Sequence, residues 1–256
     1  MIELRGVSKK FSAFTVVNNV SFTIRPGEVL GYLGPNGAGK TTTIRMLASL
    51  LEPTKGEILF EGHDIRSDIY AYKRRLGYVP EQSEIYLHLS AYDYLIMVGR
   101  LRGMSERPLN AKIIELLKIF DLDQDMHGPI SSYSKGMRQK VLISAALLHD
   151  PDILLLDEPL SGLDVTTSLI IRDLIQKLAR EKKIIMYSSH VLEVTEQVCS
   201  RIIILHQGNI VANDSVENLR SLMNLPSLTE IFSQLVVKED TGLAAERIID
   251  VIRKAG

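Results

Sequence analysis

The sequence predicts an α/β fold with a mostly parallel sheet, and two observations indicate it. Continuous apolar runs rich in β-branched residues occur at 153–156, 184–187 and 202–205. Such runs are typical of strands buried on both faces of a parallel sheet. Helical spacing of apolar residues lies between them, and strands that alternate with helices indicate a layered α/β domain. The two helical sets are Ile171, Leu174, Ile175 and Leu178, and then Val191, Val194, Thr195 and Val198.

Three further strands and one helix are predicted before residue 80. Short apolar runs indicate strands over 29–33, 58–60 and 76–79. A helix follows the first of these strands and is predicted to stop at the proline- and glycine-containing turn 53–56. Its apolar side chains are spaced for one helical face, at Ile44, Leu47, Ala48 and Leu51.

The middle of the chain, about residues 89–148, carries helical periodicity and no convincing strand. We interpret it as a helical subdomain inserted into an α/β core, so that one cassette spans residues 1–215. Residues 216–256 are polar with a mostly helical pattern, and form a predicted C-terminal extension. The two clearest helices of the middle region are marked by Ile113, Leu116, Leu117 and Phe120, and by Met137, Val141, Ala145 and Leu148.

Composition excludes several classes of protein. The 256 residues include 30 basic and 31 acidic ones, a net charge of −1, which argues against nucleic acid as a partner because phosphate binding needs a basic surface. The single cysteine, Cys199, excludes an internal disulfide and favours a reducing, cytoplasmic compartment. No apolar run is long enough to span a bilayer and the N-terminus lacks a signal-peptide stretch, so we expect a soluble chain with a sizeable core.

A glycine-rich loop at residues 34–41 matches the phosphate-binding pattern G-x-x-x-x-G-K-[ST] in full. It lies between a predicted strand and a predicted helix, where backbone N–H groups and the helix N-terminus attract a polyanion. Lys40 is expected to contact the outer phosphates, and the Thr41 hydroxyl to hold Mg²⁺. The predicted nucleotide-binding residues here are Gly34, Pro35, Asn36, Gly37, Ala38, Gly39, Lys40, Thr41 and Thr42.

Two carboxylates, Asp157 and Glu158, follow the apolar run 153–156. The carboxyl ends of parallel strands face the ligand crevice, so this pair is expected beside the phosphates. Asp157 is predicted to hold Mg²⁺ and Glu158 to polarise an attacking water. Without the glycine-rich loop upstream, two solvated acids at a strand end would be the simpler interpretation.

The segment 134–139, Ser-Lys-Gly-Met-Arg-Gln, precedes a predicted helix. A serine hydroxyl and free N–H groups at a helix N-terminus can form a second anion site, although a serine there can equally be a simple cap. Two anion sites in one chain could grip one nucleotide, or could serve two nucleotides across a dimer.

With these motifs in this order, the sequence resembles the ATP-binding subunit of ABC transporters over about residues 1–215. The resemblance implies a P-loop NTPase core with an antiparallel N-terminal sheet. The segment 134–139 differs from the common family form Leu-Ser-Gly-Gly-Gln and is similar to that of bacterial exporter ATPases: Tyr133 replaces the leucine, and Lys135 and Met137 flank the retained Gly136. The matching positions are 34–41, 134–139, 155–159, 161–164 and His190.

The resemblance implies two copies packed head to tail, as a homodimer or a heterodimer, with two ATP molecules and Mg²⁺ between them. Each ATP would lie between the Lys40 loop of one copy and Ser134, Gly136 and Gln139 of the other. Glu158, His190 and Lys40 would be catalytic, with His190 on the γ-phosphate, although His190 could instead cap the next helix. Four residues would cross the interface and couple the sites: Ser161, Gly162, Leu163 and Asp164.

The implied activity is ATP hydrolysis that powers transport, of the export type, through a separate transmembrane subunit. The chain would be cytoplasmic, at the inner face of the cell membrane, and membrane-associated only through that partner. Segment 84–102 would receive the partner, unless its apolar residues belong to the helical core. The alternative is a non-transport ABC ATPase acting on nucleic acid or the ribosome, which one cassette, one cysteine and no sustained heptads disfavour.

Two positions leave alternatives open. Phe11 matches the ring that the family stacks on adenine, although Phe14 could compete and either could be a plain edge-strand aromatic. The family usually has a glutamine after the strand 76–79, where an ungapped count gives Glu81 and Gln82 comes next, so Gln82 or Glu81 would reach Mg²⁺. The remaining histidines are interpreted as surface residues: His63, His88, His127, His149 and His206.

Overall fold

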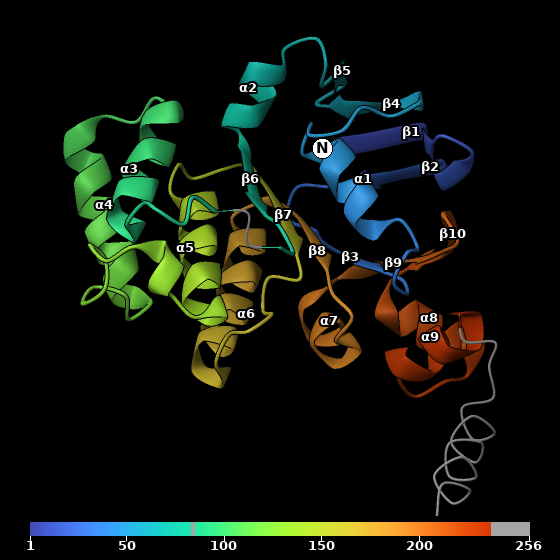
Figure 1. The fold of residues 1–256 in the computed structure, drawn as a ribbon. Coiled ribbons are helices and arrows are strands. Elements are labelled where there is room, and N and C mark those ends of the chain that lie inside the picture. The colour runs from blue at the N-terminus through green and yellow to red at the C-terminus, as the bar shows by residue number, and fades with distance from the viewer. Residues whose placement is uncertain (83–84, 237–256) are drawn as a thin grey trace, which may run out of the picture.

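The computed structural model describes residues 1–82 and 85–236 and contains a six-stranded sheet at its centre (Figure 1). The strand order is β10-β9-β3-β8-β7-β6, parallel except for the β9–β10 pair. Every residue of β3, β7 and β8 is buried, as predicted from their unbroken apolar runs. The strands are β3 (Val29–Leu33), β6 (Leu76–Val79), β7 (Ile153–Asp157), β8 (Ile184–Ser188), β9 (Arg201–His206) and β10 (Asn209–Asp214).

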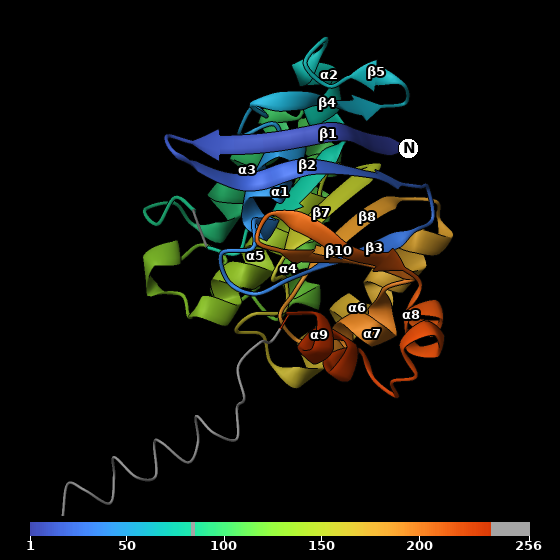
Figure 2. The same cartoon turned by 90° about the vertical axis from the view of Figure 1, so that its right-hand side faces the viewer.

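A four-stranded antiparallel sheet in the order β2-β1-β4-β5 lies beside the central sheet, as Figure 2 shows. The resemblance predicted this sheet, and the α/β fold with a mostly parallel core is confirmed. A buried apolar cluster joins the two sheets around α1 (Lys40–Leu47). Its strands are β1 (Ile2–Phe11), β2 (Phe14–Ile24), β4 (Lys55–Phe60) and β5 (His63–Asp64).

Helix α1 ends earlier than the periodicity of the sequence predicts. The predicted helix extends to Leu51, whereas α1 stops at Leu47. Ser49 adopts φ 55°, and the N–H of Leu50 donates to the carbonyl of Arg45 at 2.9 Å. A left-handed residue with a bond closing back over the last turn is a common helix stop, and it satisfies a carbonyl that the helix leaves free.

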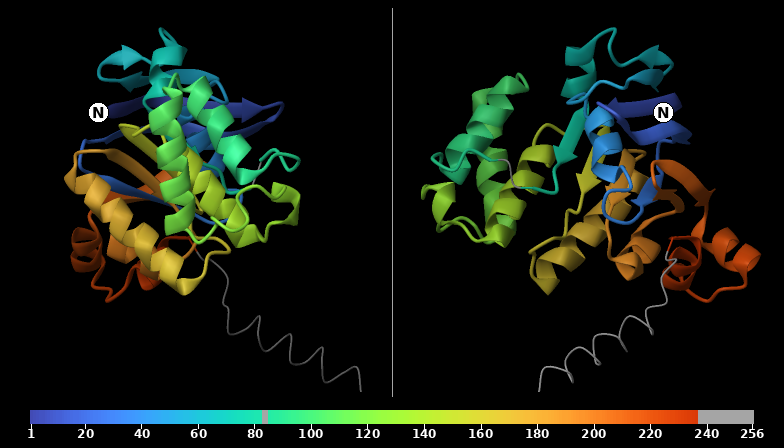
Figure 3. Two further views of the ribbon diagram at one scale, coloured as in Figure 1. Left: turned by 90° about the vertical axis from the view of Figure 1, so that its left-hand side faces the viewer. Right: turned by 45° about the vertical axis from the view of Figure 1, so that its right-hand side comes forward.

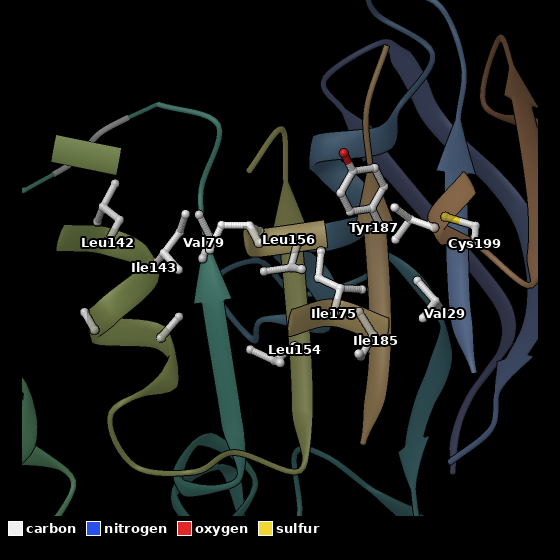
Figure 4. Close-up of a cluster of buried hydrophobic side chains, with 14 of the residues drawn as sticks. Val29, Val79, Leu142, Ile143, Leu154, Leu156, Ile175, Ile185, Tyr187 and Cys199 are labelled. Carbon is white, nitrogen blue, oxygen red and sulfur yellow. The ribbon is translucent and has the colours of Figure 1, made fainter. Parts of the chain in front are cut away.

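A second apolar cluster covers the opposite face of the central sheet (Figure 4). Val79, Leu156 and Ile185 point from the sheet towards helices α5 (Lys135–Leu147), α6 (Val165–Arg180) and α7 (Leu192–Val198). The last helices, α8 (Val216–Met223) and α9 (Leu228–Val236), join the same cluster. The two strand-end carboxylates are therefore carried by a sheet covered on both faces.

Residues 89–148 form helices that lie to one side of the central sheet (Figures 1 and 3). They comprise α3 (Ala91–Leu101), α4 (Glu106–Ile119), a short 3₁₀ turn at Ile130–Ser132, and α5. Leu95, Leu109, Ile113 and Leu117 are fully buried between them. Helix α2 (Ile69–Arg74) lies outside this group and leads into β6.

Strand β10 was not predicted, because its polar sequence alternates exposed and half-buried positions. It pairs with β9 across a two-residue turn, Gln207-Gly208, in which both residues have positive φ. That geometry matches the tight turn that suits the natural twist of a hairpin. Of the predicted C-terminal extension, residues 237–256 lie outside the described residues. Among the helices that are described, none is long and apolar enough to span a membrane.

Candidate nucleotide-binding and catalytic site

The glycine-rich loop runs from the end of β3 to the start of α1 and packs closely against β9 at Gly34. A Cβ on Gly34 would lie 2.4 Å from the carbonyl oxygen of Leu205, so only glycine fits there. Gly39 caps α1 with φ 105° and contributes no side-chain cap. The first N–H groups of α1 are therefore left without a side-chain partner, which is the arrangement that binds phosphate at a helix N-terminus.

Lys40 lies inside this loop and faces the carboxylates. Its Nζ donates to the carbonyls of Gly34 at 2.7 Å and Pro35 at 3.2 Å. Burial lowers the pKa of Lys40, while the nearby charges of Glu158, Asp157 and Glu81 act in the opposite direction. A cation held by loop carbonyls beside several acids is placed to meet a phosphate.

A cavity of about 540 Å³ lies between the loop and the carboxyl ends of the strands. It brings together residues from β2, the loop, β7 and the segments after β6 and β8, although they are far apart in the sequence. Of the predicted loop residues, Gly34, Pro35 and Ala38 do not line it, and Ala38 is buried. The lining residues are Val16, Asn36, Gly37, Gly39, Lys40, Thr41, Thr42, Glu81, Asp157, Glu158 and His190.

Asp157, the last residue of β7, presents a buried carboxylate to this cavity. Asp157 is only 1% exposed, and its Oδ2 has no hydrogen-bond partner among the described residues. Burial is the largest cause that raises its pKa. An unsatisfied buried carboxylate oxygen is costly by itself and fits a divalent cation.

The donor set suits Mg²⁺, a hard cation that takes oxygen ligands. Asp157, the Thr41 hydroxyl and Glu81 supply oxygen atoms around one corner of the cavity. No cluster of three or more His, Cys, Asp or Glu side chains suited to a metal occurs within 1–82 and 85–236. Mg²⁺ needs no such cluster, because substrate phosphates and waters complete its shell beside one or two carboxylates.

Glu158 is held in a defined position by its neighbours. It adopts φ 50°, an uncommon conformation for a residue with a side chain, and its N–H donates to the carbonyl of Ser188 at 2.9 Å. Oε2 accepts from the Ser189 hydroxyl at 3.2 Å, and Oε1 lies 2.8 Å from Nδ1 of His190. Because a carboxylate only accepts, Nδ1 carries the proton of this bond.

His190 bonds to the buried Glu158 and is itself largely exposed to solvent. Its side chain is 71% exposed, and it lies in the segment that follows β8. With Nδ1 turned to Glu158, the other ring nitrogen remains available to a ligand. The structure thus joins the predicted catalytic residues Lys40, Glu158 and His190 in one cavity.

The segment after β6 brings Glu81 into the cavity, and not Gln82. Oε2 of Glu81 lies 3.5 Å from the Thr41 hydroxyl, which donates to it. Gln82 is exposed and does not line the cavity. Of the two alternatives left open by the sequence, the geometry favours the carboxylate at the ungapped position.

At the segment where a second anion site was predicted, the structure shows the helix cap that was the alternative for Ser134, and anion binding there stays a prediction. Ser134 caps α5, with its hydroxyl accepting from the N–H of Met137 at 3.2 Å. Gly136 is required for close packing, since a Cβ there would lie 2.4 Å from the carbonyl oxygen of Gly162. Gln139 differs from expectation: it is 1% exposed and its amide donates to the carbonyl of Pro159 at 3.0 Å. Its buried amide argues against the direct nucleotide contact predicted for it.

The four residues predicted to couple two sites follow the acid pair in a turn before α6. Asp164 caps α6, accepting from the N–H of Thr167 at 2.8 Å and from its hydroxyl at 2.7 Å. These bonds lower the pKa of Asp164 to about 2. Ser161 accepts from Nζ of Lys135 at 2.7 Å, and Leu163 is partly buried against the core.

Phe11 and Phe14 face each other across the β1–β2 turn and both are exposed. Nζ of Lys9 lies 5.1 Å from the ring centroid of Phe11. Neither ring lines the cavity, whereas Val16 on β2 does and was not predicted. Val16 is an aliphatic residue on a hairpin and belongs to no binding motif, so only the fold could identify it as a lining residue of the cavity.

Two histidines predicted to be surface residues are partly buried. Nε2 of His149 bonds to the carbonyl of Leu76 at 3.0 Å, and burial lowers the pKa of His149 to about 4. Both ring nitrogens of His206 are buried without a hydrogen-bond partner among the described residues. His149 follows α5 and bonds to β6, whereas His206 is the last residue of β9, and the sequence pattern does not reveal either position.

Similarity to solved structures supports a nucleotide-binding cassette. A structure described as the ATP-binding subunit of an ABC transporter has a TM-score of 0.86 and 30% identity, covering 92% of this chain and 99% of that one. The dimeric post-hydrolysis state of the ATP-binding cassette MJ0796, bound to ADP and Pi, has a TM-score of 0.78 and 26% identity, covering 84% and 98%.

Sequence relatives agree with the structural ones. The chain is 41% identical to the ABC transporter ATP-binding protein NatA of Bacillus subtilis (strain 168), over 93% of this chain and 99% of the relative. It is 35% identical to the Nod factor export ATP-binding protein I of Burkholderia lata, over 82% of this chain and 69% of the relative. Residues 17–161 match the family described as ABC transporter. The chain therefore belongs to the ABC transporter family, as an ATP-binding cassette that hydrolyses ATP to power transport.

Proposed function

We propose that this chain is the ATPase of an export-type transporter, with Glu158 as the residue that activates water for attack on the γ-phosphate of ATP. The observation that carries the proposal is the position of Glu158 inside the cavity, fixed by Ser189 and by His190 at 2.8 Å. A base held by two partners is already oriented, which general base catalysis requires. Lys40 would neutralise charge that develops on the transferred phosphoryl group.

Asp157, Thr41 and Glu81 would hold Mg²⁺ beside the phosphates. The ion would supply charge neutralisation on the β- and γ-phosphate oxygens. The N–H groups at the start of α1 would bind the phosphates, and Phe11, at the tip of the β1–β2 hairpin, would stack on the base. The exposed free nitrogen of His190 would meet the γ-phosphate.

Two copies would work together, as a homodimer or with a related ATPase subunit. The dimeric cassette bound to ADP and Pi, which shares this fold, supports that arrangement. Ser134 and Gly136 of one copy would close over the nucleotide of the other, and Ser161, Gly162, Leu163 and Asp164 would lie at the interface. ATP would favour the closed pair because only there does the γ-phosphate touch both copies.

Closure of the dimer would act on a membrane-embedded subunit, and the cassette would lie at the cytoplasmic face of the membrane. The match to a Nod factor export protein supports the export direction, and so does the similarity of segment 134–139 to that of bacterial exporter ATPases. Tyr86 and Leu87 are exposed next to α3 and could meet the partner, whereas Leu89, Tyr92 and Met97 are half-buried. Loss of co-purification with a membrane protein after Tyr86→Asp, but not after the exposed control Leu222→Asp, would support this surface.

The decisive test of the site is Glu158→Gln, which keeps the side-chain shape and removes the base. ATP hydrolysis should fall by at least about 100-fold, the usual contribution of a general base, while ATP binding is retained and a dimer accumulates. Glu193→Gln, on the exposed face of α7, is the matched control and should hydrolyse ATP normally. Normal turnover in Glu158→Gln would exclude this assignment.

A further inference from the structure

The turn after the acid pair is fastened to the first turns of α5 by side-chain bonds. Nζ of Lys135 donates to the hydroxyl of Ser161 at 2.7 Å. Nζ of Lys140 lies 3.4 Å from Oδ2 of Asp164. Together with the Gln139–Pro159 bond, these contacts run along residues 159–164 from one end to the other.

Backbone packing makes the same junction tight. A Cβ on Gly136 would lie 2.4 Å from the carbonyl oxygen of Gly162, so the two backbones are in direct contact. A Cβ on Gly162 would lie 3.1 Å from Cγ and Cδ of Lys135, so the aliphatic stem of this lysine covers Gly162. The lysine thus contributes both a hydrogen bond and an apolar contact.

The contacts come from one side of α5. Lys135, Gly136, Gln139 and Lys140 are spaced at i, i+1, i+4 and i+5, and residues at this spacing share a helix face. Ser134, the cap of the same helix, is one residue before them. The turn that they hold begins directly after Glu158 and ends at Asp164, the cap of α6.

We infer that Lys135 is a positioning residue that holds the turn 161–164 against the start of α5, so that Ser134 and Glu158 move as one unit. The inference rests on the proposed function, in which Ser134 serves the partner's nucleotide and Glu158 serves its own. Closure on one ATP then sets the position of the base at the other ATP. The common family form has glycine in place of Lys135, and glycine offers no side chain for this bond.

We therefore expect the two ATP molecules to be bound and hydrolysed cooperatively, and we expect this cooperativity to depend on the Lys135–Ser161 bond. Lys135→Met keeps an aliphatic stem and removes the donor, Ser161→Ala removes the acceptor, and Lys135→Arg keeps a donor. Each variant is made both alone and with Glu158→Gln. The matched control is Lys112→Met, an exposed lysine in the middle of α4.

Two readouts test the bond in the full chain. In the Glu158→Gln background, light scattering gives the ATP concentration for half-maximal dimer formation. Lys135→Met and Ser161→Ala should each raise this concentration about two- to tenfold, the range expected for loss of one hydrogen bond. With Glu158 intact, both should bring the Hill coefficient of ATP hydrolysis towards 1. The combination of Lys135→Met with Ser161→Ala should shift both readouts no further than either change alone, because both changes remove the same bond. Lys135→Arg should behave like the wild type at this position.

Results that contradict the role of Lys135 can be distinguished from failure of the proposed function. If Glu158→Gln dimerises with ATP, but Lys135→Met leaves both readouts like those of Lys112→Met, the inference about Lys135 is wrong. An additive double variant, or a Lys135→Met effect explained by a lower melting temperature alone, also overturns it. If Glu158→Gln itself never dimerises with ATP, the two-site function fails first, and the inference falls with it.

Discussion

Nδ1 of His190 lies 2.8 Å from Oε1 of Glu158, so the exposed histidine and the buried acid form one unit at the ends of β8 and β7. Ser189, the neighbour of His190, bonds to the other carboxylate oxygen. The segment after β8 therefore fixes both oxygens of the residue proposed as the base. Loss of the contact between His190 and Glu158 should lower the rate of ATP hydrolysis more than it weakens the binding of nucleotide.

His190→Ala removes the partner of Glu158 and the group proposed to meet the γ-phosphate. We expect kcat for ATP hydrolysis to fall by about 100-fold or more, as for loss of an oriented acid–base group. The affinity for ATP should change by less than about threefold, since a contact made in the transition state acts on kcat. Steady-state ATPase assays and fluorescent-nucleotide titration measure the two effects, with exposed His63→Ala as the control.

Glu81 and Gln82 form a natural matched pair, because only Glu81 lines the cavity. Glu81→Ala should raise the Mg²⁺ concentration needed for half-maximal ATP binding about tenfold, the lower end for loss of a residue supporting a metal site. Gln82→Ala should leave the titration unchanged. The assignment is contradicted if Gln82→Ala produces the larger shift.

Asp157→Asn should stabilise the protein in the absence of nucleotide and Mg²⁺. Burial raises the pKa of Asp157, so the ionised form is disfavoured in the folded state at neutral pH. Since the folded carboxyl holds its proton more tightly, the wild type gains stability as pH falls towards that raised pKa, and Asn should remove this gain. The melting temperature at pH 7 should rise by about 2–4 °C, the shift for ~1 kcal/mol in a domain of this size.

The same variant should lose the melting-temperature increase that MgATP gives to the wild type, because the proposed metal ligand is gone. Asp173→Asn, on the exposed side of α6, should match the wild type in both measurements. A lower melting temperature for Asp157→Asn without ligand would show that the buried charge is not the dominant cost.

Asp164 gives a pH dependence of the opposite sign. Bonds from Thr167 hold its pKa at about 2, below the ordinary value of 3.8, so the capped carboxylate contributes stability above pH 3.8 that is lost as pH falls through 2. Asp164→Ala should lower the urea midpoint at pH 7, and the difference from wild type should shrink as pH is lowered from 4 to 2. A difference that stays constant with pH would exclude the charged cap as its cause, and exposed Asp173→Ala is the control.

The sequence could predict the central strands because burial on both faces of a sheet requires unbroken apolar runs. It could not predict β10, whose polar residues are held by pairing with β9. The end of α1 was also missed, since Leu51 continues the apolar spacing although Ser49 turns the chain out of the helix. Periodicity reports which face is apolar, but a left-handed residue that ends a helix leaves no such mark.

By itself, the sequence determined the phosphate loop, the acid pair and their order along the chain, because these groups are fixed by local backbone needs and by strand ends. Only the tertiary structure placed Glu81 rather than Gln82 in the cavity, added Val16 to its lining, and turned Gln139 inward to Pro159. It also joined Lys135 to Ser161 across 26 positions of sequence. The physical reason is that such contacts depend on how separate elements pack, and packing brings together side chains whose spacing along the chain carries no pattern.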